Sequence, residues 1–290
     1  MSPRDLVALL ALAAVWGGSF LFIRLSVAAL GPLPLAAARV AIGAVVLWLG
    51  LRALGRPLPL RGRARGLLVL GLLNAAVPYA LISAAELHLT ASYAAMLNAT
   101  VPLWSVAFGA VWLGERVTAK RVAGLVVGLL GVAVLVGWSP IAMSPVVVLC
   151  VVATLVATAS YALAGIYAKK RLGDVPAPAL ALGQQLGALP WLVLPAAWQL
   201  PQAHPTGGAL AALLALGVLS TAFAYLLYFQ LIGTVGPTRT STVTYLLPVF
   251  GSAWGALFLG EAVTWPLVAG CAVVFLGTAL ATGMLRPGRP

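Results

Sequence analysis

Polar and aromatic side chains interrupt long apolar stretches of this sequence. Amides, hydroxyls and aromatic rings can hold the polar and apolar parts of a small solute together. Their types therefore suit reversible binding better than bond-making chemistry. The candidates for a binding cavity are Trp16, Ser19, Tyr79, Tyr93, Met96, Asn98, Tyr161, Gln184, Gln185, Tyr225, Ser241, Thr242 and Tyr245.

Motifs for catalysis are missing. The sequence has no HExxH or CxxC motif, no phosphate-binding glycine loop and no pair of acids within an apolar run. A channel would need rings of charge or a filter loop, and neither occurs. A membrane-embedded enzyme stays as the alternative from a different class. No cofactor and no metal are expected.

Composition places the chain in a membrane. Of its 290 residues, 62% are apolar and 8% are charged, whereas a soluble domain carries about 25% charged residues. Apolar runs of about 20 residues fit a hydrocarbon core about 30 Å thick, and lipid requires them to be helices. The predicted spans are 6–26, 33–51, 66–86, 92–113, 119–137, 145–168, 177–198, 209–231, 238–259 and 265–284.

We interpret the net charge of +12 through membrane topology rather than as a sign of nucleic-acid binding, because the positions of Lys and Arg indicate how the chain is oriented in the membrane. With the N-terminus in the cytoplasm, fifteen of the seventeen Lys and Arg residues fall in cytoplasmic segments and none in an external loop. Arg24 and Arg39 lie within spans. The sequence thus predicts a multi-pass protein of the inner (plasma) membrane with both termini cytoplasmic. The first apolar run is interpreted as an uncleaved span, not a signal peptide.

Two windows of the sequence repeat one another. GAVWLGERVTAKRVAG (109–124) and GALFLGEAVTWPLVAG (255–270) match at ten of sixteen positions, with an offset of 146 residues. One repeat holds five spans, an odd number, so the second copy enters the membrane from the opposite side. Its box then lies in an external loop, and only the box of the first copy keeps positive charges, on the cytoplasmic side. We therefore predict an inverted 5+5 repeat, with one five-helix unit at 1–138 and the other at 145–284, a layout common in secondary transporters.

Three features together resemble a known family. They are the stretch WGGSFLFIR (16–24), the GExVT box at 114–118 and 260–264, and the proline-bearing helices before each box. The chain resembles EamA-type ten-helix transporters of the drug/metabolite transporter superfamily, and in general similarity their amino-acid exporter branch. The resemblance implies a central cavity lined by helices one to four and six to nine, with helices five and ten outside.

Three further residues are functional candidates with open alternatives. Pro102 and Pro248 sit mid-span at matching positions, so their kinks are predicted to serve gating, although static bends would look the same. Arg39 is the deepest charge, which makes it a functional candidate. It could instead snorkel outward, and contact with carbonyls or with a substrate carboxylate is open.

The acids lie at span ends or in loops. Proton-coupled carriers often keep an acid at mid-membrane depth, so its absence weakens the case for proton coupling. Glu86 with His88 is the local pair that would titrate if coupling exists. We interpret the glutamates of the GExVT box, Glu115 and Glu261, as structural, with Thr118 and Thr264 capping the next helices.

The predicted function is export of a small metabolite, with amino acids favoured, by alternating access. Efflux of a drug or of another metabolite, such as a sugar or nucleotide precursor, is the alternative. The expected partners are a small-molecule substrate and the lipid bilayer, without nucleic acid, in a monomer or weak homodimer. The small-residue faces of spans five and ten could meet lipid, each other or a second chain.

Overall fold

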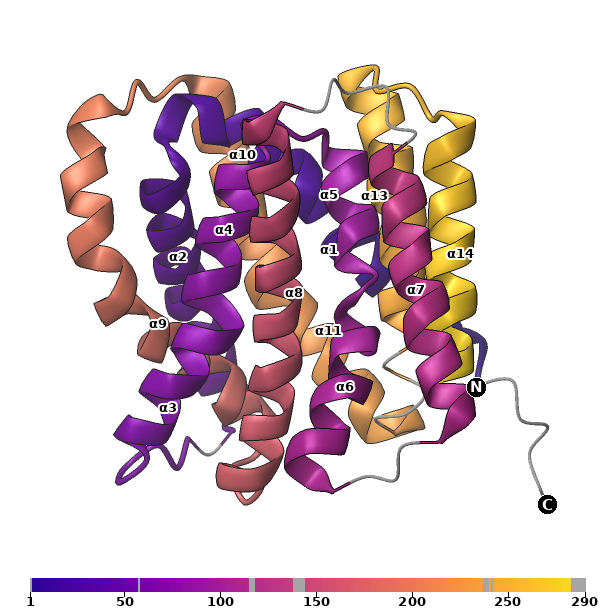
Figure 1. Cartoon of the computed structure of the whole chain (residues 1–290). Helices are drawn as coiled ribbons and strands as arrows, with labels where there is room; N and C mark the ends of the chain where they lie inside the picture. The colour runs from indigo at the N-terminus through magenta and orange to yellow at the C-terminus, as the bar shows by residue number, and fades with distance from the viewer. Residues whose placement is uncertain are drawn as a thin grey trace.

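The computed structural model describes residues 2–56, 58–114, 118–137, 144–236, 240 and 242–282, and its regular elements are all helices (Figure 1). The elements are α1 (Pro3–Leu30), α2 (Pro32–Ala53), α3 (Ala64–Gly71), η1 (Leu72–Ala76), α4 (Val77–Ala85), α5 (Ala91–Asn98), α6 (Val101–Leu113), α7 (Ala119–Gly137), α8 (Pro145–Arg171), α9 (Ala177–Gln199), η2 (Leu200–Gln202), α10 (Gly207–Gly217), η3 (Val218–Phe223), α11 (Ala224–Val235), α13 (Val243–Leu259) and α14 (Trp265–Thr282).

The predicted all-helical architecture of ten helical stretches is confirmed. Eight described helical stretches are long and apolar enough to cross a membrane, and α7 and α13 complete the set. Three spans are not uniform helices. The third is α3–η1–α4 and the eighth is α10–η3–α11, each with a π-helical segment in its middle. The fourth divides into α5 and α6 at Ala99 and Thr100.

The GExVT box has a local structural basis at its glycine. Gly114 ends α6 and Gly260 ends α13, with φ values of 65° and 66°. This left-handed conformation carries little penalty only for glycine, so both copies of the repeat use the same helix terminator. The Thr118 Oγ1 accepts a hydrogen bond from the Arg121 backbone N–H at 3.3 Å, which confirms that predicted cap. The Thr264 Oγ1 has no hydrogen-bond partner among the described residues.

Helices α7 and α14 pack tightly on each other at one side of the bundle (Figure 1). A Cβ added at Gly277 would come 2.2 Å from the backbone nitrogen of Gly128, and one added at Gly124 would come 2.3 Å from that of Ala281. Backbones approach this closely only where small residues face one another. The small-residue faces of spans five and ten therefore meet each other.

The remaining helices interleave the two halves of the chain. Helix α1 packs against α13, α10 and α11, while α2 and α3 pack against α9, and α4 and α6 pack against α8. Every one of these pairs joins a helix before residue 138 to a helix after residue 144. The interior between the halves is consequently built by residues far apart in the sequence.

Candidate binding cavity

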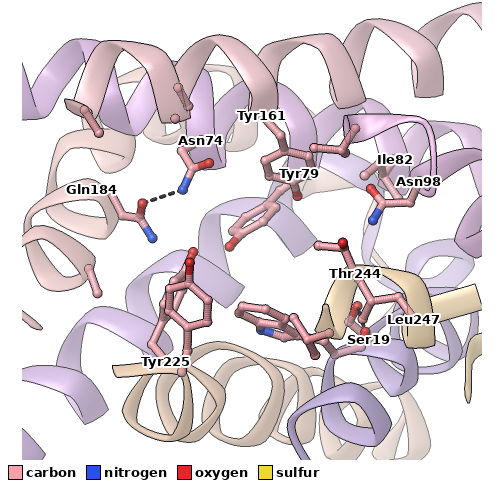
Figure 2. Close-up of a pocket in the computed structure, with 18 of the residues that line it drawn as sticks. Ser19, Asn74, Tyr79, Ile82, Asn98, Tyr161, Gln184, Tyr225, Thr244 and Leu247 are labelled. Carbon is pink, nitrogen blue, oxygen red and sulfur yellow. Dashed lines mark hydrogen bonds between the residues drawn. The ribbon is translucent and has the colours of Figure 1, made fainter. Parts of the chain in front are cut away.

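A cavity of about 390 Å³ lies between the two halves (Figure 2). This volume falls in the range of small-molecule sites, about 300–1,000 Å³. Elements α1, α2, α3, η1, α4, α5 and α6 line it from the first half, and α8, α9, α11 and α13 from the second. Neither α7 nor α14 contributes a described lining residue. The cavity is therefore lined by spans one to four and six to nine, as the family resemblance implied.

Eight of the predicted site residues line this one cavity. They are Trp16, Ser19, Arg39, Tyr79, Asn98, Tyr161, Gln184 and Tyr225. Asn74 and Thr244 line it as well, and Figure 2 shows their side chains facing the same space. Trp16 and Tyr225, which are 209 residues apart in the sequence, are thus brought together, with their ring centroids 6.0 Å apart.

Other predicted residues lie elsewhere. Tyr93 and Met96 are buried in the apolar cluster that also contains Leu135 and Cys271. The Tyr245 ring packs on Phe275 of α14, with centroids 5.9 Å apart. The residues outside the described cavity lining are Tyr93, Met96, Gln185, Thr242, Tyr245, Pro102 and Pro248, and Ser241 falls outside the described residues.

The two prolines occupy different places in their helices. Pro102 is the second residue of α6, directly after the division of the fourth span. Pro248 lies inside α13, which continues through it. A proline in the first turn of a helix needs no hydrogen bond from its nitrogen, whereas an interior one removes a bond. A gating role for either residue stays a prediction.

The paired π-helical segments each carry a hydrogen bond between the two halves of the chain. At the 146-residue repeat offset, η1 from Leu72 corresponds to η3 from Val218. In η1, Asn74 Nδ2 donates to Gln184 Oε1 of α9 at 2.5 Å. In η3, Thr221 Oγ1 accepts from Arg39 Nε of α2 at 3.0 Å. Each link joins the two halves, and π-helical turns of this kind are frequent at functional sites.

Among the residues that line the cavity, two buried amide atoms have no hydrogen-bond partner in the described part of the chain. They are Nε2 of Gln184 and Oδ1 of Asn98, and both side chains line the cavity. A buried polar atom without a partner is rare, because its desolvation is uncompensated. One is a donor and the other an acceptor, so a ligand with both kinds of group would satisfy them.

An aromatic wall completes the cavity. The Trp16 ring lies 5.4 Å from that of Tyr228, and Tyr225 stacks on Phe229 with centroids 6.0 Å apart. Tyr228 and Phe229 line the cavity but were not among the predicted residues. Their spacing of three and four residues from Tyr225 places them on one helix face, which is the signal that could have found them.

One end of the cavity is closed by a network of polar groups. Glu261 accepts hydrogen bonds from the backbone N–H groups of Ala91 and Ser92, at 2.8 and 2.9 Å. Arg24 donates to the backbone carbonyl of Glu86, whose side chain is fully buried. At the opposite end, the lining includes Ala168 in the last turn of α8 and the first residue of α9. The described lining thus reaches the ends of α8 and α9 on this side, whereas none of the residues in the polar network lines the cavity.

Glu86 lies one residue beyond the end of α4, and neither of its carboxyl oxygens has a hydrogen-bond partner among the described residues. Burial raises the pKa of this carboxyl well above its usual 4.5, and the charge of Glu261 raises it further, against smaller opposing effects of Arg24 and Arg39. Burial therefore favours the neutral form of this carboxyl. No described group of His, Cys, Asp and Glu could hold a metal ion.

Comparison with known protein families shows which family this chain belongs to. The sequence pattern of the EamA-like transporter family matches residues 4–137 and 148–283, which is almost the entire chain. The chain belongs to the EamA-like transporter family. It is consequently a multi-pass membrane carrier and not an enzyme.

Individual relatives of this EamA-like transporter cover nearly its full length. An "Uncharacterized transporter" of Archaeoglobus fulgidus is 27% identical over 270 residues, covering 90% of this chain and 92% of the relative. A "Probable amino-acid metabolite efflux pump" of Salmonella typhimurium is 28% identical over 292 residues, covering 96% and 94%. A crystal structure with 22% identity superposes with a TM-score of 0.68 over 98% of both chains, which supports the fold.

Proposed function

We propose that this EamA-like transporter exports a small metabolite, with amino acids as the favoured class, across the inner (plasma) membrane by alternating access. The observation that carries the proposal is the cavity between the two halves, closed at one end, with an unsatisfied donor on Gln184 and an unsatisfied acceptor on Asn98. An amino acid offers a group to each. The name of the Salmonella relative supports the same class.

The orientation follows from the positive charges. Lys169, Lys170 and Arg171 end α8 at the end toward which the cavity extends, and clustered positive charges mark the cytoplasmic side. Both termini are then cytoplasmic, and the structure is the inward-facing state. A solute enters from the cytoplasm, while the network around Glu261 and Glu86 closes the external end.

Export requires the closed end to separate. Helices α1 and α13 pack closely on each other: a Cβ added at Gly17 would come 2.7 Å from Cβ of Phe250. Glu261 belongs to the second half and its hydrogen-bond donors to the first. Rocking of the halves breaks these contacts, opens the cavity outward and closes the cytoplasmic end, as in other inverted-repeat carriers.

The test is counterflow in proteoliposomes that contain the purified protein. Vesicles are loaded with one unlabelled amino acid, and uptake of the labelled form is followed with and without an imposed proton gradient. We expect saturable uptake of a subset of amino acids, absent from protein-free vesicles. If no amino acid is taken up but a drug, sugar or nucleotide precursor is, the amino-acid class is wrong and the alternative efflux function holds.

A further inference from the structure

Arg39 places a buried positive charge in the wall of the cavity. Its side chain is 7% exposed and lines the same space as Trp16 and Asn98. In the described part of the chain, one ion pair is formed, between Arg63 and Asp174, and it lies outside the cavity. No described acid forms an ion pair with Arg39. An isolated charge in a low-dielectric interior is costly unless a counter-ion is present for part of the working cycle.

The guanidinium of Arg39 is held in a fixed orientation. Its Nε donates to Thr221 Oγ1, and its central carbon lies 3.8 Å from the ring centroid of Tyr79. The face of the guanidinium is therefore stacked on the Tyr79 ring, and its Nε edge is fixed by the hydrogen bond to Thr221. No described hydrogen bond uses the two terminal nitrogens. A guanidinium presents those nitrogens as a fork that matches the two oxygens of a carboxylate.

The surroundings provide no internal anion for this fork. The described lining residues include no Asp, Glu, Lys or His, so the wall carries one positive charge. Glu86 is the acid whose charge would interact with Arg39, but burial raises the pKa of its carboxyl, which favours the neutral form, and no described ion pair joins the two residues. Asn98 and Gln184 are neutral amides. The missing counter-ion must then come from the ligand.

We propose that Arg39 is a substrate-binding residue that selects ligands with a single carboxylate, and that the α-amino group of such a ligand is dispensable. This inference rests on the proposed transport function. One guanidinium balances one negative charge, so a phosphate ester would bring excess charge. A ligand without an anionic group leaves Arg39 unpaired. The apolar remainder of the ligand packs on the wall around Trp16 and Tyr228.

The dispensable amine follows from the neutral groups of the site. No described acid faces the cavity to attract an ammonium group. The available acceptor is the amide oxygen of Asn98. An amide can turn its nitrogen toward a 2-oxo oxygen as readily as its oxygen toward an ammonium. Amino acids and the corresponding 2-oxo acids should thus bind with similar strength, while amino-acid amides should not.

The experiment uses matched ligands that differ in one group. Leucine, leucinamide and 4-methyl-2-oxopentanoate share one side chain, and phenylalanine, phenylalaninamide and phenylpyruvate form a second set. Each is added to the purified protein in detergent, and the rise in thermal unfolding midpoint gives its affinity. We expect each acid and its 2-oxo analogue to agree within about threefold and the amide to bind at least about tenfold more weakly. Glycerol 3-phosphate serves as the phosphate probe.

Variants assign the selectivity to one residue. Arg39→Gln should bind acid and amide equally, and Arg39→Lys should keep part of the preference because it keeps the charge but not the fork. Arg24→Gln is the matched control: Arg24 also lies within a span, but it contacts the Glu86 carbonyl and does not line the cavity. It should retain the acid-to-amide ratio of the wild type.

The outcomes separate this inference from the transport proposal. Equal binding of acid and amide by the wild type, unchanged selectivity in Arg39→Gln, or no midpoint shift with any carboxylate would each overturn the role of Arg39. Tighter binding of glycerol 3-phosphate would replace the carboxylate by a phosphate. Arg39-dependent binding without counterflow in vesicles would support the inference and contradict the transport function. Uptake without carboxylate preference would do the reverse.

Discussion

Glu261 in the second half of the chain caps a helix of the first half through Ser92. The Glu261 Oε2 lies 2.9 Å from the Ser92 backbone nitrogen and 2.5 Å from Ser92 Oγ. Ser92 is the second residue of α5, where backbone N–H groups lack helical partners and the helix dipole favours negative charge. The GExVT box at 260–264 thus links the two halves at the closed end, while Glu115 of the box at 114–118 falls outside the described residues.

Replacing Glu261 should weaken that closure. Glu261→Ala leaves the N–H groups of Ala91 and Ser92 without their carboxylate, so we expect a loss of about 2 kcal/mol in unfolding free energy in detergent. Glu261→Gln, which keeps one good acceptor, should lose less. Thermal unfolding of the three proteins measures the order. The cap hypothesis is contradicted if Glu261→Ala unfolds at the wild-type temperature.

The buried Glu86 should make stability depend on pH. Its pKa is raised in the folded state above the usual 4.5, so the folded protein binds a proton that the unfolded chain has lost. Its contribution is fully present below the unfolded pKa and is lost as pH rises toward the folded pKa. The slope reaches about 1.4 kcal/mol per pH unit. Unfolding in detergent between pH 5 and 8 measures it.

The matched variant for this prediction is Glu86→Gln, which has the same shape and no proton to lose. It should remove the Glu86 part of the pH dependence and be the more stable protein at the upper end of the range. His88→Gln changes the neighbouring titratable residue and should leave the Glu86 slope in place. An identical slope in the wild type and in Glu86→Gln would show that another group is responsible.

The contact between α7 and α14 should not tolerate an added methyl group. In Gly277→Ala the new Cβ would come 2.2 Å from the backbone nitrogen of Gly128, and backbone atoms cannot move aside as a flexible side chain can. Overpacking of this kind costs about 1–3 kcal/mol. Gly233→Ala is the control, because no atom lies within 4 Å of its added Cβ. It should be neutral or stabilising by up to about 1 kcal/mol. Thermal unfolding compares the two, and equal midpoints would contradict the packing argument.

Much of this architecture is readable from the sequence, because lipid imposes simple rules. Span length, helical structure and the repeat follow from apolar runs and from one recurring box. Arg39 stands out because a charge within a span is rare. The sequence does not determine which side chains of a helix face the cavity, because this depends on the helices packed against it. Gln184 faces the cavity and Gln185 does not, although both have the same type and differ by one position, about 100° of rotation.

The π-helical segments and the Glu261 cap were hidden for a related reason. An extra residue in one helical turn leaves no mark in hydropathy, because the apolar pattern shifts by a single position. The Ser92 that Glu261 binds lies 169 residues earlier in the chain. Nothing local to the box indicates this partner. The sequence supported only the interpretation that the box is structural.

Cavity variants should separate transport from folding. Asn98→Ala removes the unsatisfied acceptor, and Trp16→Ala removes the ring that packs on Tyr228 at 5.4 Å. Each should lower counterflow by about tenfold, the effect of losing roughly 1.4 kcal/mol of ligand interaction. Tyr245→Phe is the control, because Tyr245 packs on Phe275 outside the lining and keeps its ring. Its transport should equal the wild type. Thermal unfolding and size-exclusion chromatography verify that both alanine variants are folded. If both folded variants transport normally, the solute passes elsewhere and the unsatisfied amides have another role.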